Sequence, residues 1–565
     1  MTELPERAPT ATSDQEADVT GADLVLHGGA VYTVDAARRW AQAVAVTDGR
    51  SVAVGTNRDV RELSCRRTEL VDLRGRMLLP GFQDAHVHAG SGGLERLRCD
   101  LSGVHSREGY LATIRRYADA NPDAGWILGG GWSMDVFPGG VPHRADLDAV
   151  TPDRPVFLPN RDHHAVWVNS RALELAGVDG TTPDPPHGRI ERDASGRPSG
   201  VLHEGAARLV GRLVRAPTPD ELRAALRIAQ RYLHSLGVTA WQEAIVGEYD
   251  SVPDLYEAYR SMDAAGELTA TVVGALWWDR DRGLDQLDGL LARRAGAATG
   301  RFRATHVKVM LDGVCEAFTA SMRDPYVGRG GRGLDFVDPA RLPEYVTALD
   351  AADFGVHFHA IGDRAIGSAL DAVATARERL GDQGNRHQVA HVQVVDPADV
   401  LRFHRLGVAA NLQALWACHE PQMTELTLPF LGAERARWQY PFGGFARNGV
   451  ALGFGSDWPV SSPDPFQALH VAVNRVAPDA AEGTRETEPF LPEQALDLAT
   501  ALAGYTIGSA YLNGLDADTG SIEVGKRADL VVLDRDLFAA PANRLRDART
   551  VLTLVDGHPV FESDS

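Results

Sequence analysis

The sequence has little that would suit a secreted, membrane-embedded or nucleic-acid-binding protein. Its 565 residues contain only four cysteines, and no two have the close spacing of a disulfide framework or a cysteine zinc site. No segment reaches the roughly 18 uninterrupted apolar residues that a membrane helix requires. The net charge of -20 argues against a surface for nucleic acid or anionic lipid. We therefore expect a cytoplasmic protein without nucleic-acid or membrane partners.

The first residues also lack the basic start and apolar stretch of a signal peptide. Residues 1–21, MTELPERAPTATSDQEADVTG, are polar, acidic and proline-containing. Such a composition buries too little apolar surface to fold, so we expect a disordered acidic tail.

The two ends of the remaining chain share a pattern of short apolar runs separated by turns. Residues 22–80 contain runs such as ADLVLHGGAVYTV and the turn signals HGG, DGR and LRGR. Residues 515–565 repeat this style in GSIEVGKRADLVVLDRD and RTVLTLVDGHPVFES. We expect the two segments to form one composite β-sandwich.

The rhythm changes in residues 81–514, where strand-like runs alternate with helical stretches. LGVTAWQEA, ATHVKVMLDG, FGVHFHAIGD, HQVAHVQVV, GVAANLQAL and VALGFGSDWP have the composition of buried strands. PDELRAALRIAQRYLHSLG and RAIGSALDAVATARERLG have the helical period. This alternation predicts βαβ units on a parallel sheet, and the fold class α/β.

The stretch GFQDAHVHAG places two histidines, His86 and His88, at the end of an apolar run. Residues two apart on a strand point to the same side, so the two imidazoles form half of a metal site. Taken alone, such a pair more often represents surface histidines in a turn. Similar polar residues end later apolar runs: Lys308, His359, His391 and Asp457.

The spacing of these residues fits a (β/α)₈ barrel, in which each unit takes about 30 residues. His359 and His391 are 32 residues apart, which is one unit, and Asp457 lies 66 residues further, which is two. The 220 residues between His88 and Lys308 exceed three units by roughly 130. We therefore place an inserted subdomain at about residues 95–225 of a TIM-like barrel.

The ordered motifs resemble the amidohydrolase superfamily of metal-dependent hydrolases, and within it the amidohydrolase family 3 branch. GFQDAHVHAG, HAIGDRA, VAHVQVVDP, GSDWPV and GSIEVGKRADLVVLD carry this resemblance, which covers nearly the whole chain after residue 21. That branch includes N-substituted formamide deformylases. The resemblance implies a TIM-like barrel and hydrolysis of a carbon–nitrogen bond in a small-molecule amide. It also implies a homodimer.

The resemblance further implies one or two divalent ions, with zinc as the expected metal, held by five residues: His86, His88, His359, His391 and Asp457. Asp457 is expected to act also as general base and acid, taking the proton of the attacking water and returning it to the leaving nitrogen. His357 shares a face with His359, and we expect it to pack behind the site. A lysine in the apolar run HVKVML loses its charge on burial, and Lys308 is expected to bind metal as a CO2-derived carbamate. The alternative is a Lys308 that reaches solvent or pairs with Asp312.

The inserted region has further residues that resemble the branch. We expect His164, in RDHHAVWVNS, and Trp132, in GWSMDVF, to contact substrate. Trp132, Trp167 and Trp241 form either an aromatic wall or, as tryptophan more often does, part of the ordinary core. Gln413, in GVAANLQA, is a further expected polar contact. Glu204 is either an active-site carboxylate or part of a turn.

These observations predict an amidohydrolase that cleaves a linear amide, of the N-substituted formamide or N-acyl amine type. Hydrolysis of a cyclic amide or an ester at the same metal is the alternative within enzymes. A catalytically silent relative that binds or regulates, and a barrel with a purely structural ion, are the other two possibilities.

Overall fold

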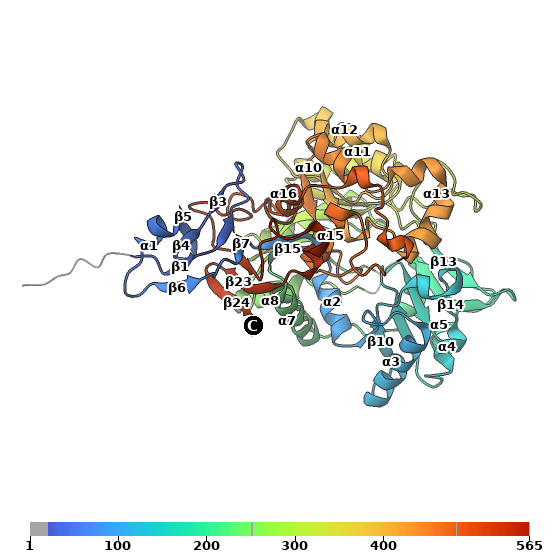
Figure 1. Cartoon of the computed structure of the whole chain (residues 1–565). Coiled ribbons are helices and arrows are strands. Elements are labelled where there is room, and N and C mark those ends of the chain that lie inside the picture. The colour runs from blue at the N-terminus through green and yellow to red at the C-terminus, as the bar shows by residue number, and fades with distance from the viewer. Residues whose placement is uncertain (1–20, 250–251, 482, 564–565) are drawn as a thin grey trace, which may run out of the picture.

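The computed structural model describes residues 21–249, 252–481 and 483–563, so the predicted acidic tail lies outside the described residues except for Gly21. Figure 1 shows a barrel surrounded by helices, with a β-rich extension on one side and a separate lobe below it. Among the helices of the described ranges, none combines the length and apolar composition that crossing a membrane requires.

The barrel is a sheet of eight parallel strands within the described residues. Their order is β8 (Phe82–Val87), β15 (Val238–Val246), β16 (Thr271–Trp277), β17 (Phe302–Met310), β18 (Gly355–Ala360), β19 (Gln388–His391), β20 (Ala409–Leu412) and β21 (Leu452–Phe454). The segment after β21 closes the ring, because Asp457 N donates to His86 O at 2.7 Å and His88 N donates to Trp458 O at 2.8 Å. The predicted TIM-like barrel is confirmed.

Helices cover the outside of the barrel and are set by local sequence signals. Thr218 begins α7 (Pro219–Ser235) with a capping box to Glu221, and proline occupies the first turn. The remaining helices of residues 81–514 outside the lobe are α2 (Ala89–Arg96), α8 (Tyr256–Ala264), α9 (Leu287–Gly296), α10 (Leu342–Ala351), α11 (Asp363–Leu380), α12 (Pro397–Leu406), α13 (Leu428–Arg435), α14 (Phe442–Arg447), α15 (Pro465–Asn474), α16 (Leu498–Ala503) and α17 (Ser509–Leu512).

Strands from both ends of the chain build the β-rich extension, as predicted. One sheet has the order β5 (Arg50–Gly55), β4 (Ala43–Thr47), β1 (Leu24–His27) and β6 (Glu69–Asp72). The other has the order β24 (His558–Glu562), β23 (Thr550–Val555), β22 (Leu530–Leu533), β7 (Met77–Pro80), β2 (Ala30–Tyr32) and β3 (Trp40–Ala41). Apolar side chains of both sheets form one buried cluster, which makes the pair a sandwich. Only Gly81 separates β7 from the first barrel strand, and a Cβ there would lie 2.4 Å from the Thr239 side chain.

The lobe is inserted between α2 and α7, after the first barrel strand. Its six strands, in sheet order, are β13 (Gly188–Arg192), β14 (Pro198–Glu204), β12 (Ala165–Val168), β11 (Val156–Pro159), β10 (Ile127–Gly130) and β9 (Cys99–Asp100). Helices α3 (Arg107–Ala120), α4 (Arg144–Asp148), α5 (Ser170–Ala176) and α6 (Arg208–Gly211) accompany them. The lobe has two apolar clusters of its own, so it is a structural unit attached to the barrel.

Candidate metal centre

The polar residues predicted to act together converge at the ends of the barrel strands. His86 lies in β8 and His88 directly follows it, while Lys308, His359 and His391 lie on three consecutive strands, β17, β18 and β19. Asp457 follows β21. All six side chains line one cavity of about 70 Å³, at the strand ends where barrel enzymes carry their active sites.

Three of these side chains form a compact donor group. Asp457 Oδ1 lies 3.3 Å from His86 Nε2 and 3.1 Å from His88 Nε2, and the ligand atoms of the three residues all lie within 4.8 Å of one another. His391 is adjacent, with Nδ1 3.9 Å from Asp457 Oδ2. His359 lies one step further, its ring centroid 4.5 Å from that of His391.

The donor group has the chemistry that a divalent cation requires. Asp457 Oδ1 and His391 Nδ1 are buried without a well-formed hydrogen bond to the described residues, so both atoms can serve as ligands. Burial lowers the pKa of His86, His359 and His391 well below the usual range of histidine, which keeps these imidazoles neutral. Burial would raise the pKa of Asp457, but the contact with His88 and nearby positive charge lower it to about 2. The residues present therefore fit a metal ion.

A chain of buried hydrogen bonds sets the tautomer of His86. Gln242 Oε1 accepts a hydrogen bond from Gln388 Nε2 at 3.1 Å, which identifies it as the oxygen, and it contacts His357 Nδ1. His357 must therefore carry its proton on Nδ1, and its Nε2 accepts from His86 Nδ1 at 2.7 Å. This arrangement leaves the lone pair of His86 Nε2 facing Asp457. His357 thus orients the candidate donor His86 from behind.

The backbone at the site adopts conformations that residues other than glycine rarely adopt. His391 has φ 77°, Val392 has φ 41° and Asp457 has φ 57°, all in the left-handed region. Close packing requires glycine at position 455, because a Cβ there would lie 2.7 Å from His86 N. Such strain persists only where the surrounding structure enforces it, and it gathers at functional sites.

Lys308 is buried beside the donor group and forms no ion pair with a carboxylate in the part of the chain that the structure describes. Its Nζ lies 3.4 Å from His86 Nε2, and burial lowers the pKa of Lys308 to about 7. The alternative pairing with Asp312 is not present, because that carboxylate accepts backbone N–H groups of Ser321, Ile361 and Gly362. A large fraction of Lys308 is thus neutral at physiological pH.

The inserted lobe contributes His164 to the wall of the cavity. Its Nδ1 lies 3.0 Å from both carboxylate oxygens of Glu204, and Thr319 Oγ1 donates to Glu204 Oε1 at 2.8 Å. Burial would lower the pKa of His164, but Glu204 outweighs it and raises the pKa to about 9. The predicted contact residue is therefore a cation at the cavity, and Glu204 is its counter-ion.

Four other expected contacts lie away from the cavity. Trp132 is fully buried in the lobe, where Nε1 donates to Leu158 O at 2.8 Å and the ring packs edge-on against Trp167. Trp241 is a buried residue of β15, and its Nε1 donates to the Tyr259 hydroxyl at 3.3 Å. Gln413 is also buried, and its Oε1 accepts from His391 N at 2.7 Å. The aromatic-wall prediction is corrected: these tryptophans are core residues. Gln413 positions His391 and does not line the substrate cavity.

Trp416 and His163 also line the cavity, although neither was predicted as a site residue. Trp416 stacks on His391, with ring centroids 5.4 Å apart and planes at 4°. His163 forms an ion pair with Glu95 at 2.9 Å. Trp416 follows β20 as Asp457 follows β21, so its place after a barrel strand was a usable signal.

Comparison with known proteins agrees with this geometry. The model of the amidohydrolase family matches residues 69–561. N-substituted formamide deformylase of Arthrobacter pascens is 29% identical over 95% of this chain and 97% of that protein. Protein LONG AFTER FAR-RED 3 of Arabidopsis thaliana is 30% identical over 91% of this chain and 87% of that protein.

Solved structures show the same relationship. A metal-dependent hydrolase of Pyrococcus horikoshii OT3 superimposes with a TM-score of 0.72 and 26% identity, covering 92% of this chain and 99% of that one. The family match spans most of the chain and includes the strands that carry the donor group. The predicted resemblance is confirmed, and the chain belongs to the amidohydrolase family.

Proposed function

We propose that the protein hydrolyses the carbon–nitrogen bond of a linear amide, of the N-substituted formamide or N-acyl amine type. The observation that carries this proposal is the set of buried, unprotonated donors at the mouth of the barrel, with the ligand atoms of His86, His88 and Asp457 all within 4.8 Å of one another. The N-substituted formamide deformylase relative, matched over nearly its whole length, supports the linear amide as substrate.

Zinc is the proposed metal, because imidazole and carboxylate donors suit it. When bound, a divalent cation polarises a carbonyl group and promotes the ionisation of water. We propose as ligands His86, His88, His359, His391 and Asp457.

Lys308 is proposed to carry a carbamate that adds an oxygen ligand. Its neutral amine nitrogen forms a bond to the carbon of CO2, one carbon–oxygen π pair moves to oxygen, and the nitrogen releases one proton to water. Burial favours this step because it keeps a fraction of Lys308 unprotonated near neutral pH.

The chain's own residues divide the proton transfers. Asp457 begins as an anion, since its pKa lies near 2, and accepts the proton of the attacking water. It then returns that proton to the leaving nitrogen, which departs as an amine. His164, charged through Glu204, has an Nε2 that forms no hydrogen bond with the described residues. It donates to the carbonyl oxygen as negative charge develops there.

The size of the cavity favours a small acyl group. Apolar residues provide much of its wall: Ile245, Met310, Val314, Ile361, Trp416 and Val460. A volume of about 70 Å³ accommodates a formyl or short acyl group beside the donors. Larger parts of the substrate must extend out of it.

The test is a hydrolysis assay of zinc-loaded protein on N-formyl and N-acetyl amines, with release of the free amine as readout. We expect turnover of at least one class, and loss of about a thousandfold or more in Asp457→Asn with zinc still bound. Asp479→Asn, at a position outside the site, is the matched control. An Asp457→Asn variant that hydrolyses amides at the native rate contradicts the proposal.

A further inference from the structure

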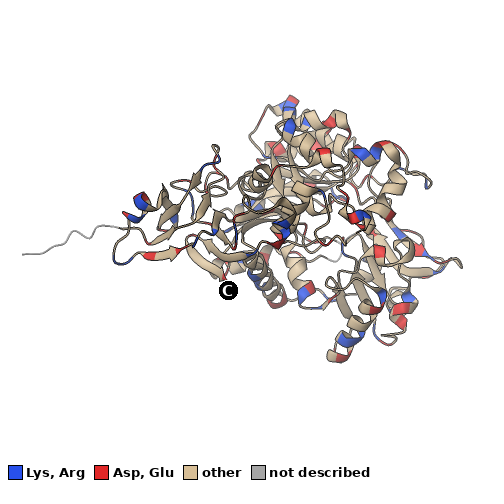
Figure 2. Cartoon of the chain, viewed as in Figure 1, with Lys and Arg blue, Asp and Glu red and all other residues tan. Residues whose placement is uncertain are grey.

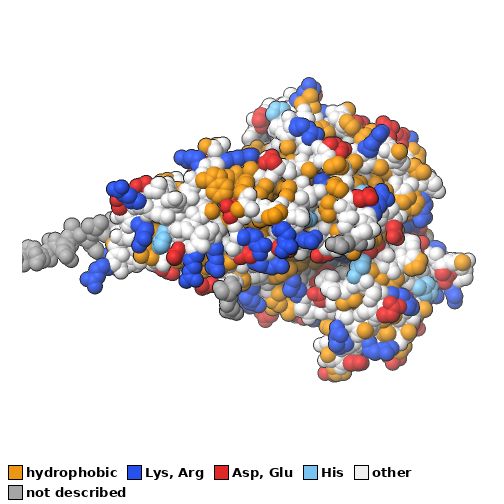
Figure 3. All heavy atoms as spheres, in the orientation of Figure 1, with side chains coloured by type: hydrophobic (Ala, Val, Ile, Leu, Met, Phe, Trp, Pro, Cys, Tyr) orange, Lys and Arg blue, Asp and Glu red, His pale blue; other side chains and the backbone are white. Residues whose placement is uncertain are grey.

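A second, larger cavity adjoins the metal centre. It measures about 610 Å³ and shares the wall residues Ser91, His163 and Val252 with the smaller cavity at the donors. Its walls come from α2, Glu248 and residues 252–254 on the barrel side, and from β10, β11 and α6 on the lobe side. Figure 3 shows the surface hollowed where lobe and barrel meet. A molecule held at the donors can therefore extend into this cleft.

Four arginines line the cleft: Arg98, Arg208, Arg212 and Arg215. The chain as a whole has a net charge of -20, and Figure 2 shows its basic and acidic residues mixed over the outer helices. Three carboxylates also line the cleft. Glu95 is paired with His163 at 2.9 Å and Asp254 with Arg293 at 2.6 Å, and Glu248 is exposed.

Two of the arginines have no counter-ion within the described residues. Arg208 is paired with Asp281 at 3.5 Å, and Arg215 with Glu221 at 2.8 Å. Arg98 and Arg212 form no ion pair and no side-chain hydrogen bond there. Arg98 is half-buried, and burial lowers its pKa. A half-buried guanidinium without a partner is unfavourable, and an anion in the cleft would remove that penalty.

The cleft continues beyond Arg98 into an apolar recess. A third cavity of about 460 Å³ shares Leu94, Arg98, Leu128 and Arg215 with it. Tyr117 and Trp126 form part of its wall, and its Glu221 is paired with Arg215. A molecule that extends outward from the donors therefore meets first polar, then cationic and then mostly apolar surroundings.

We propose that the arginine cleft, defined by Arg98 and Arg212, binds an anionic group on the part of the substrate remote from the scissile amide. The ligand chemistry is a carboxylate or a phosphate, which a guanidinium recognises with paired hydrogen bonds. The inference rests on the proposed amide hydrolysis and narrows its substrate class to amides with an anionic tail.

The experiment uses N-formyl ω-amino acids with three to eight carbons, each compared with its neutral methyl amide. Compounds of several lengths are needed so that the carbon chain of at least one of them spans the distance from the donors to the cleft. We expect kcat/KM of one or more carboxylates to exceed that of the neutral partner by about ten- to a hundredfold. N-formyl ω-aminoalkyl phosphates of the same lengths show whether the cleft prefers the phosphate.

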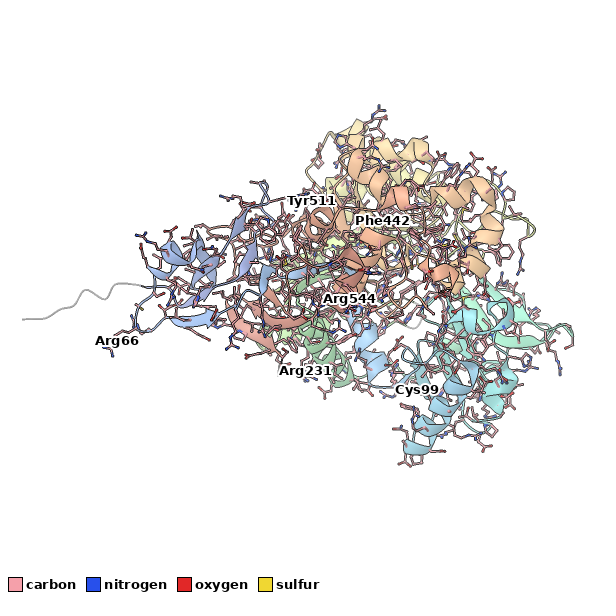
Figure 4. All side chains as sticks on the ribbon, viewed as in Figure 1. Arg66, Cys99, Arg231, Phe442, Tyr511 and Arg544 are labelled. Atoms are coloured by element: carbon pink, nitrogen blue, oxygen red, sulfur yellow. The ribbon has the colours of Figure 1, made fainter. Side chains whose placement is uncertain are left out.

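The preference should depend on the two arginines. Arg98→Gln and Arg212→Gln, singly and together, should lower kcat/KM for the anionic amides. They should leave kcat/KM for the neutral amides unchanged, and this unchanged activity also shows that the variants fold. Arg231→Gln is the matched control, because Arg231 is an exposed arginine on α7 outside the cleft (Figure 4). Equal rates for anionic and neutral amides at every length, or a preference that survives loss of both arginines, overturn the inference.

Direct binding separates this inference from the proposed function. Calorimetry with the ω-amino acid products measures binding to the cleft without any hydrolysis. Binding that requires Arg98 and Arg212, together with no hydrolysis of any amide, would refute the hydrolase proposal but support the anion site. Hydrolysis of neutral amides without any effect of the arginines would refute the anion site alone.

Discussion

Replacing Glu204 with glutamine should release the proton that His164 holds at neutral pH. His164 Nδ1 lies 3.0 Å from both Glu204 oxygens, and the two side chains are 11% and 1% exposed, so little solvent screens the pair. The carboxylate raises the pKa of His164 to about 9 against the effect of burial. Glutamine keeps the shape and removes the charge, so burial dominates. A fall of the pKa from about 9 to 6.5 or below corresponds to roughly 3 kcal/mol of lost interaction.

The pair also sets a pH window for stability. The folded pKa of His164 lies above its unfolded value of about 6.5, so its contribution is complete below pH 6.5 and is lost as the pH rises through 9. The folded pKa of Glu204 is lowered: burial raises it, but the charge of His164 outweighs burial. Its contribution is therefore present above its unfolded pKa of about 4.3, and is lost as the pH falls through the lowered value. In Glu204→Gln both of these pH-dependent contributions to stability should be lost.

The assay is an NMR titration of metal-free protein labelled with ¹³C at the histidine rings, with His164→Gln to assign the resonance. Glu191→Gln is the matched control, since Glu191 contacts His203 at 3.4 Å in the same lobe and should leave His164 unchanged. A His164 that titrates near 6.5 in the native chain, or near 9 in Glu204→Gln, would refute the reasoning.

Three further results are expected. Gln242→Leu removes the acceptor that fixes the tautomer of His357 and, through His357, that of His86. The zinc affinity measured by chelator competition should therefore fall about 10- to 100-fold. An unchanged affinity would contradict the role of these hydrogen bonds in setting the tautomer of His86. Trp416→Ala should raise KM for amides with little loss of stability, whereas Trp132→Ala should destabilise the lobe by about 3–5 kcal/mol and leave KM unchanged. The reverse result would contradict the placement of Trp132 in the core of the lobe and of Trp416 at the cavity. Protein incubated with ¹³C-bicarbonate and zinc should show a carbamate resonance that Lys308→Arg lacks, and its presence in the variant excludes Lys308 as its source.

Much of the fold was predictable because each barrel strand is a short apolar run with its own boundary signals. The apolar runs that end in His88, His359, His391 and Asp457 all became barrel strands, and the long interval before Lys308 contains the lobe. Strand β16, TVVGALW, was not among the predicted runs. It carries no polar residue of the donor group, so the ordered motifs did not mark it.

The candidate site was predictable where residue order and chemistry sufficed. The structure brings His86, His88 and Asp457 together as the ordered motifs indicated, although they lie far apart in the chain. It could not be predicted that Trp132 turns into the lobe core, because residue type does not show which way an indole faces. The left-handed backbone at His391, Val392 and Asp457 also has no signal in these residue types, since it is imposed by packing around them.

The central claim is that His86, His88, His359, His391 and Asp457 hold a divalent ion at the mouth of the barrel. X-ray absorption at the zinc edge of purified, zinc-loaded protein tests it most directly. We predict nitrogen and oxygen neighbours at about 2.0–2.2 Å with the outer scattering of several imidazoles, reduced in His86→Ala. Zinc that fails to bind, or that shows sulfur neighbours or no imidazole scattering, would contradict it.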